Sequence, residues 1–252
     1  MKRIIKAPAK INLCLKVNGK RDDGYHDLTS VMQKISLFDT IEFEIIKENE
    51  FDIFELLPKL DVPIKLPELP KLDIEFLSAF FQKKFDYNSD KQINIKCNYN
   101  YLPTDDRNLI VKVTKYIYDR YNIKDKIYIY LKKMIPTSGG LGGGSSDAAT
   151  MLLFLNRHYK LNLSTDELNY VAAMFGSDIP FFVHKKVSIC EGRGEKVTEI
   201  KPYNNYYILI ATPNVRVSTK EIFYRLDLNE ISAERKIIEK EKFRSEEHTS
   251  EL

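Results

Sequence analysis

The sequence lacks three features that would each indicate a particular class of protein. It has no long uninterrupted apolar run, so no membrane-spanning helix is predicted. It has no block of basic residues, because 39 Lys and Arg stand against 36 Asp and Glu and leave a net charge of only +3 over 252 residues. We therefore expect neither a membrane nor a nucleic acid as a partner.

Cysteines are also few. The three, Cys14, Cys97 and Cys190, are widely separated and odd in number. This spacing argues against a disulfide framework and against a cysteine-based zinc site. The first ten residues do not contain the apolar region of a signal peptide. Together these features predict a soluble protein of the reducing cytoplasm.

Strand and helix patterns follow each other without a regular repeat. Apolar runs predict strands within residues 2–17 and 31–47, around a turn-rich segment, and further strands at 93–98, 127–131, 187–190, 196–200 and 206–212. Helical spacing predicts helices at 108–121 and 151–155, and two capping boxes, at Ser164 and Ser218, each open another helix. The absence of a regular βαβ alternation favours the α+β class.

Residues 51–90 differ in composition from the segments on either side. Several prolines interrupt a Leu- and Lys-rich stretch, after which Phe76, Phe80 and Phe81 fall at helical spacing. We predict an inserted arm whose aromatic face packs beside a substrate domain or against a second subunit.

A glycine-rich loop is the most unusual segment. Residues 136–146 contain five glycines within six positions, followed by Ser145 and Ser146 at the start of a predicted helix. Free backbone N–H groups and the helix dipole favour an anion there, and phosphate is the obvious one. The spacing fits neither a P-loop, which needs Lys after its last glycine, nor a dinucleotide fingerprint. A solvent-exposed glycine linker stays open as the alternative.

The motif Pro136-x-x-x-Gly-Leu-Gly-x-x-Ser-Ser-x-Ala-Ala resembles the phosphate-binding motif of the galacto-, homoserine, mevalonate and phosphomevalonate kinases. Four more segments, at residues 8–13, 23–28, 176–182 and 191–195, look like motifs of the family members that act on a cytidine diphosphate-linked methylerythritol. The resemblance implies a two-lobed α+β kinase fold. It also implies transfer of a phosphoryl group from ATP, with Mg²⁺, to the 2-hydroxyl of that small molecule in the non-mevalonate isoprenoid and terpenoid pathway.

Two alternatives for the function stay open beside this interpretation. One is another small-molecule kinase of the same superfamily, and the other is an inactive nucleotide-binding protein. The resemblance also divides the chain into an ATP-binding domain at residues 1–185 and part of a substrate domain at 186–243. The sequence does not specify an oligomeric state.

The resemblance assigns two catalytic residues. Asp178 is the carboxylate near the acceptor hydroxyl, and Lys10 either holds it ionised or stabilises charge on the developing alkoxide. The alternative for Asp178 is a helix cap, since Ser-Asp-Ile-Pro is also good cap chemistry. The alternative for Lys10 is an ordinary solvated lysine.

The remaining predicted site residues bind ligands. For ATP they are Pro136, Thr137, Ser138, Gly139, Gly140, Leu141, Gly142, Gly143, Gly144, Ser145, Ser146 and Asn108. For the substrate they are Asn12, Tyr25, His26, Lys133 and Phe223. An aromatic ring can stack on cytosine and a histidine can bond its edge. The alternatives are a buried helix residue for Phe223 and a strand-end lysine for Lys133. No metal ligand is predicted.

The end of the chain departs from the family pattern. The glycine-rich motif that the family carries late in its sequence does not occur after Pro213. Residues 244–252 match the translation of a common sequencing adapter. We therefore expect the genuine sequence in this chain to stop near Phe243, the real gene to continue, and the substrate lobe to be truncated here.

Overall fold

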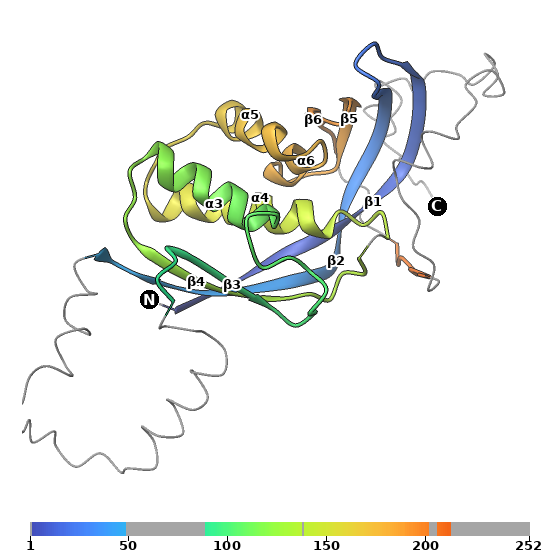
Figure 1. Ribbon diagram of the computed structural model, residues 1–252. Coiled ribbons are helices and arrows are strands. Elements are labelled where there is room, and N and C mark those ends of the chain that lie inside the picture. Colours follow the sequence, from blue (N-terminus) through green and yellow to red (C-terminus); the bar gives the residue numbers. More distant parts are fainter. Residues whose placement is uncertain (1, 49–88, 138, 202–205, 213–252) are drawn as a thin grey trace, which may run out of the picture. The chain divides into compact units, whose positions relative to one another are not determined.

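The computed structural model describes residues 2–48, 89–137, 139–201 and 206–212 (Figure 1). The chain packs as two units that interleave in sequence. Unit 1 consists of Met1–Lys6 and Asp39–Met134, and unit 2 consists of Ala7–Phe38 and Ile135–Leu252. This is a division by packing, so the domain boundary after residue 185 stays a prediction.

Two long strands open the chain and contribute to both units. They are β1 (Lys2–Lys20) and β2 (His26–Ile46), which pair with each other and are joined by a turn at residues 21–25 (Figure 1). The N–H of Arg21 donates to the carbonyl of Tyr25 at 2.8 Å and closes this turn. The two strands predicted at 2–17 and 31–47 are thus confirmed, and both extend further into the turn.

Unit 1 contains a βαβ crossover beside an antiparallel pair. Strands β3 (Ile93–Cys97) and β4 (Lys126–Lys132) are parallel and joined through α3 (Leu109–Arg120), while β4 pairs antiparallel with the second half of β2. Alternate β2 residues Ile41, Phe43 and Ile45 are buried and form part of the core. The strands and helix predicted in this region are confirmed.

Among its described residues, unit 2 combines three helices with an antiparallel hairpin. The helices are α4 (Gly143–His158), α5 (Thr165–Phe175) and α6 (Ile179–Val183), which contact one another. Strand β5 (Ser188–Gly192) pairs antiparallel with β6 (Lys196–Glu199) and with the first half of β2, where Val31 faces Ile189. Val31, Val187, Ile189 and Ile200 form a buried cluster. The mixture of one parallel and several antiparallel pairs confirms the α+β class.

Three local expectations turned out as follows. The capping box at Ser164 is confirmed, because its hydroxyl accepts from the N–H of Glu167 and that carboxylate accepts from the N–H of Ser164. The strand predicted at 206–212 is wrong: this segment is neither helix nor strand, and Tyr207 and Leu209 are fully exposed while Ile210 packs on a core cluster. The capping box at Ser218, the aromatic helix of the arm and residues 244–252 lie outside the described residues.

In the described part of the chain, no helix is both long and apolar enough to cross a membrane.

Candidate active site

Lys10 of β1 and Asp178 form an ion pair within unit 2. The Nζ of Lys10 lies 3.6 Å from Oδ2 of Asp178 and donates a hydrogen bond to Oδ1 of Asn12 at 3.1 Å. Lys10 is only 4% exposed, so the alternative of an ordinary solvated lysine is wrong. The side chain of Asp178 is 36% exposed, which leaves its carboxylate accessible to a ligand.

The short helix α6 holds Asp178 in place. Asp178 occupies the N-cap position, but its side chain makes no capping hydrogen bond. The alternative in which this carboxylate serves as a helix cap is therefore wrong. All five residues of α6 are buried, and the helix contacts α4 and α5. The carboxylate thus projects from a packed element, with Lys10 as its cationic neighbour.

The glycine-rich loop runs directly into α4. Gly140 and Gly142 have φ of +70° and +68°, a conformation in which a side chain would be strained. Gly142 is the N-cap of α4, which carries no acidic residue in its first turn. The helix begins at Gly143, two residues before Ser145, where its start was predicted, and it includes the apolar stretch predicted at 151–155. The N–H of Lys10 donates to the carbonyl of Leu141 at 2.9 Å, and Leu141 is buried. A loop anchored in this way is not a solvent-exposed linker, so that alternative is wrong.

Ser146 provides a second observation at this helix start. Its side chain is fully buried, and its Oγ has no hydrogen-bond partner among the described residues. A buried hydroxyl without a partner is costly, and such an atom beside open helix N–H groups fits a polar ligand. An anion would satisfy both the hydroxyl and the N–H groups, so the residues present fit a nucleotide phosphate. The other predicted phosphate-binding residues differ in burial. Five are partly buried, namely Pro136, Thr137, Gly142, Gly143 and Ser145, and three are exposed, namely Gly139, Gly140 and Gly144.

Phe182 links the loop to α6 and to Lys10. A Cβ added to Gly142 would lie 2.9 Å from Cζ of Phe182 and 3.0 Å from Cγ of Lys10. The absence of a side chain at Gly142 therefore lets the ring, the lysine stem and the loop pack together. This contact joins the predicted phosphate site to the predicted catalytic pair within one unit.

The predicted base-binding residues lie at the β1–β2 turn. Tyr25 is 54% exposed, and its N–H donates to Oδ1 of Asp23 at 3.1 Å. His26 follows as the first residue of β2. Burial raises the pKa of Asp23, but the bond from Tyr25 and the charges of Arg21 and Arg193 outweigh it and lower that pKa overall. Asn12 lies nearer the predicted catalytic pair, because its Oδ1 accepts a hydrogen bond from Lys10; it also accepts one from Ser30.

The turn between β5 and β6 holds residues whose role sequence reasoning missed. Gly192 and Gly194 have φ of +73° and +116°, and a Cβ on Gly194 would lie 3.2 Å from the carbonyl oxygen of Ser177 and 3.8 Å from Oδ1 of Asp178. The turn therefore packs against the residue that carries the predicted catalytic carboxylate. The signal in the sequence was Gly-Arg-Gly-Glu, two glycines around a single residue.

The thiol of Cys190, on β5, is not reactive. It is completely buried, and its pKa is raised to about 12, chiefly by burial and further by the charge of Asp178, with Lys10 opposing. The thiol is therefore protonated near neutral pH and is not a nucleophile.

Lys133 and Asn108 belong to unit 1, where each has a structural partner. Lys133 is buried and forms an ion pair with the fully buried Asp39, whose Oδ1 also accepts from the N–H of Met134 at 2.5 Å. Asn108 is the N-cap of α3 and accepts from the N–H of Ile110 at 2.9 Å. Their roles toward ligands stay predictions, as does that of Phe223, which lies outside the described residues together with Ser138.

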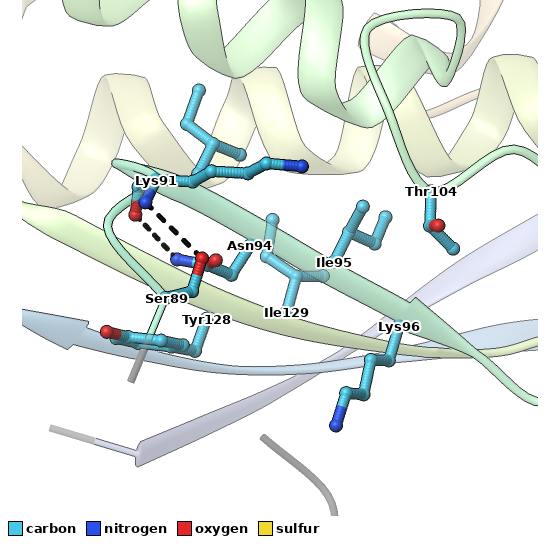
Figure 2. Close-up of a pocket in the computed structure, with 9 residues that line it drawn as sticks. Ser89, Lys91, Asn94, Ile95, Lys96, Thr104, Tyr128 and Ile129 are labelled. Carbon is cyan, nitrogen blue, oxygen red and sulfur yellow. Dashed lines mark hydrogen bonds between the residues drawn. The ribbon is translucent and has the colours of Figure 1, made fainter. Parts of the chain in front are cut away.

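A separate cavity of about 260 Å³ lies in unit 1 along β3 (Figure 2). Its polar lining includes Lys91, Asn94, Lys96 and Thr104, and the amide of Asn94 donates to the carbonyl of Lys91 at 2.8 Å. None of the predicted site residues lines this cavity, so it is not formed by the candidate active site.

Among residues 2–48, 89–137, 139–201 and 206–212, no group of three His, Cys, Asp or Glu side chains is arranged to hold a metal ion.

Comparison with known proteins agrees with this geometry. The GHMP kinases N terminal domain, whose initials stand for galacto-, homoserine, mevalonate and phosphomevalonate kinases, matches residues 108–186. The chain is 37% identical over 227 residues to a 4-diphosphocytidyl-2-C-methyl-D-erythritol kinase of Clostridium botulinum (strain Alaska E43 / Type E3), which covers 90% of this chain and 66% of that relative. The chain thus spans somewhat less than two thirds of the length of the curated relatives that it matches.

Solved structures share the fold. A crystal structure of 4-(cytidine 5'-diphospho)-2C-methyl-D-erythritol kinase matches with a TM-score of 0.52 and 26% identity, over 79% of this chain and 55% of that one. Homoserine kinase from Cytophaga hutchinsonii matches with a TM-score of 0.52 and 14% identity, over 91% of this chain and 62% of that one. From its matching domain, its fold and its similarity to these kinases, the chain belongs to the GHMP kinases.

Proposed function

We propose that this chain carries the active site of an ATP-dependent kinase that phosphorylates the 2-hydroxyl of 4-diphosphocytidyl-2-C-methyl-D-erythritol. The observation that carries the proposal is the pair of Lys10 and Asp178, 3.6 Å apart, packed through Phe182 against an anchored glycine loop. The similarity to relatives named for this activity supports the choice of substrate. The proposed reaction belongs to cytoplasmic isoprenoid precursor synthesis by the non-mevalonate route.

Phosphoryl transfer depends on positioning and on stabilisation of charge. The carboxylate of Asp178 accepts a hydrogen bond from the acceptor hydroxyl and orients its oxygen. The ammonium group of Lys10, held by Asn12, offsets the negative charge that grows on that oxygen as its proton passes to the carboxylate of Asp178. The N–H groups at the start of α4 and the hydroxyl of Ser146 bind the phosphates of the nucleotide.

ATP supplies the phosphoryl group when bound, and Mg²⁺ shares the charge of its phosphates. We expect the metal to be bound mainly through the nucleotide. Tyr25 and His26 bind the cytidine end of the substrate. A contact of Asn12 with that end is proposed from the resemblance alone, because in this structure its Oδ1 accepts from Lys10. Lys133, Asn108 and Phe223 stay proposed as ligand contacts on the strength of the resemblance alone.

The test is turnover of ATP with the cytidylylated substrate, followed by mass spectrometry of the phosphorylated product. We expect phosphorylation by the chain and a loss of at least about 100-fold in kcat for Asp178→Asn, because the neutral amide cannot take up the proton of the hydroxyl. Asp119→Asn is the matched control, since Asp119 is exposed on α3. Equal activity of Asp178→Asn and the control would remove Asp178 from this role.

The same assay separates the alternatives. Preference for mevalonate or homoserine would indicate another kinase of the superfamily. Binding of ATP without turnover of any of the three alcohols would indicate a nucleotide-binding protein without kinase activity.

A further inference from the structure

Arg193 lies at the tip of the β5–β6 turn, beside the exposed ring of Tyr25. The guanidinium carbon is 5.1 Å from the centroid of that ring, a cation–π arrangement. Neither the glycine loop nor the Lys10–Asp178 pair uses this side chain. It is therefore a cation near the predicted substrate site that the proposed mechanism has not yet employed.

The turn holds Arg193 in a defined position. The N–H of Arg193 donates to Oε2 of Glu195 at 2.7 Å, and the glycine on either side adopts a positive φ. On β5, Gly192 faces Leu28 of β2, three residues after Tyr25. Pairing of β5 with β2 thus fixes the backbone of Arg193 close to Tyr25.

The other side of the same turn lies near the carboxylate of Asp178. The position of a Cβ on Gly194 is 3.8 Å from Oδ1 of Asp178. Arg193 is consequently flanked by Tyr25 through its side chain and by Asp178 through the neighbouring residue. Along the turn, an aromatic ring and the guanidinium thus belong to the position of Arg193, and a carboxylate lies beside the next position, Gly194.

The proposed substrate presents three parts in the same order. A pyrimidine base comes first, then two linked phosphates, then the alcohol that carries the reacting hydroxyl. A base stacks on an aromatic ring, and a guanidinium binds phosphate oxygens through two parallel hydrogen bonds. A carboxylate near the hydroxyl completes the correspondence.

We propose that Arg193 binds the diphosphate of the substrate and thereby selects a nucleoside diphosphate-linked alcohol over a simple alcohol. This inference rests on the proposed function, because the carboxylate of Asp178 must face the acceptor hydroxyl for the order to hold. The contact with Tyr25 is weak enough for the guanidinium to turn its N–H groups toward the phosphates while keeping the ring beside it.

The experiment compares two ligands that differ only in the phosphates. Cytidine 5'-diphosphate and cytidine are titrated into the chain and into Arg193→Gln, with dissociation constants measured by NMR. We expect the substitution to weaken the diphosphate about tenfold or more and cytidine less than about twofold. Arg193→Lys should fall between, since lysine keeps the charge but not the two parallel bonds. Arg107→Gln is the control, because Arg107 pairs with Asp105 on an exposed loop.

Steady-state kinetics separate this inference from the proposed function. Where the wild-type chain phosphorylates the cytidylylated alcohol, Arg193→Gln should raise the KM of that alcohol about tenfold and leave the KM of ATP within about twofold. Equal weakening of cytidine and its diphosphate, or no weakening of either, would overturn the role of Arg193. Absence of turnover by the wild type would overturn the proposed function, while the titration still decides whether Arg193 binds the diphosphate.

Discussion

Replacement of Lys34 by methionine tests whether a buried charge opposes folding of unit 2. Lys34 of β2 donates hydrogen bonds from Nζ to the carbonyl of Phe182, at 2.9 Å, and to that of His184. Its Nζ also lies 5.8 Å from the centroids of the Phe181 and Phe182 rings. Methionine keeps the unbranched shape of the chain and removes both the charge and the donors.

The magnitude follows from the pKa of Lys34. Burial lowers this pKa from 10.5 to about 8, against the charge of Glu199, which raises it. At about 1.4 kcal/mol for each pKa unit, the folded chain disfavours the charged form by about 3 kcal/mol. Between the two pKa values the unfolded chain binds more protons than the folded one, so the free energy of unfolding rises with pH in this window. The neutral amine can still donate to both carbonyls.

The assay is urea unfolding of wild type and Lys34→Met over a series from about pH 7 to about pH 10. Loss of the two hydrogen bonds lowers the stability of the variant by a similar amount at every pH. Between about pH 7 and about pH 10, the free energy of unfolding should rise by about 2 kcal/mol more in the wild type than in the variant. Glu199, His184 and Lys186, which face this region, are present in both proteins, so their own contributions cancel in the difference. The exception is the charge of Glu199 acting on Lys34, whose effect is already included in the pKa of Lys34.

Lys124→Met is the control, since Lys124 is exposed and should show no change in the difference. A difference between wild type and Lys34→Met that stays flat over the series would refute the reasoning. The charged form of Lys34 would then be as stable in the folded chain as in water.

Three further substitutions or reactions test the site. Gly142→Ala would place a Cβ 2.9 Å from Phe182 at a positive φ, so we expect a fall of at least about tenfold in kcat and a lower melting temperature by circular dichroism. Ser146→Ala removes a buried hydroxyl that lacks a partner among the described residues. Without nucleotide, the substitution should raise the free energy of unfolding by about 1 kcal/mol. It should also raise the KM of ATP about tenfold, because the hydroxyl no longer binds the phosphates. Iodoacetamide should label the half-buried Cys14 before Cys190, whose pKa is about 12, as mass spectrometry of the native chain would show; equal labelling would contradict the burial argument.

Local patterns in the sequence were sufficient for most regular elements. The capping box at Ser164 depends on residues three positions apart, and it formed as expected. The exact first residue of α4 was harder to predict from the sequence. Ser145 and Ser146 were expected at its start, whereas Gly142 in the left-handed conformation starts it at Gly143. Glycine has a low helix propensity, and only the surrounding contacts bring two glycines into the first turn.

Contacts between residues that are far apart in the sequence could not be predicted from the sequence. Lys133 looked like a strand-end lysine or a ligand contact, but it is buried against Asp39, 94 positions away. Arg193 and Tyr25 are likewise remote in sequence and meet only because β5 pairs with β2. Periodicity reports which face of an element is buried and says nothing about which partner covers it. The family motifs pointed to Lys10 and Asp178 without giving the distance between them.

The helix α6 shows why such contacts matter for the site. A helix of five residues has no appreciable stability of its own, since helices that short do not persist in water. Its position must therefore come from packing and from the bonds at its two ends. Lys34 holds the carbonyls at the C-terminal end, Phe182 contacts the glycine loop, and Asp178 stands at the N-terminal end beside Lys10. Loss of the bonds made by Lys34 would thus displace α6 and, with it, both the carboxylate of Asp178 and the glycine loop. Lys34 itself contacts neither a nucleotide phosphate nor the acceptor hydroxyl in the proposed mechanism.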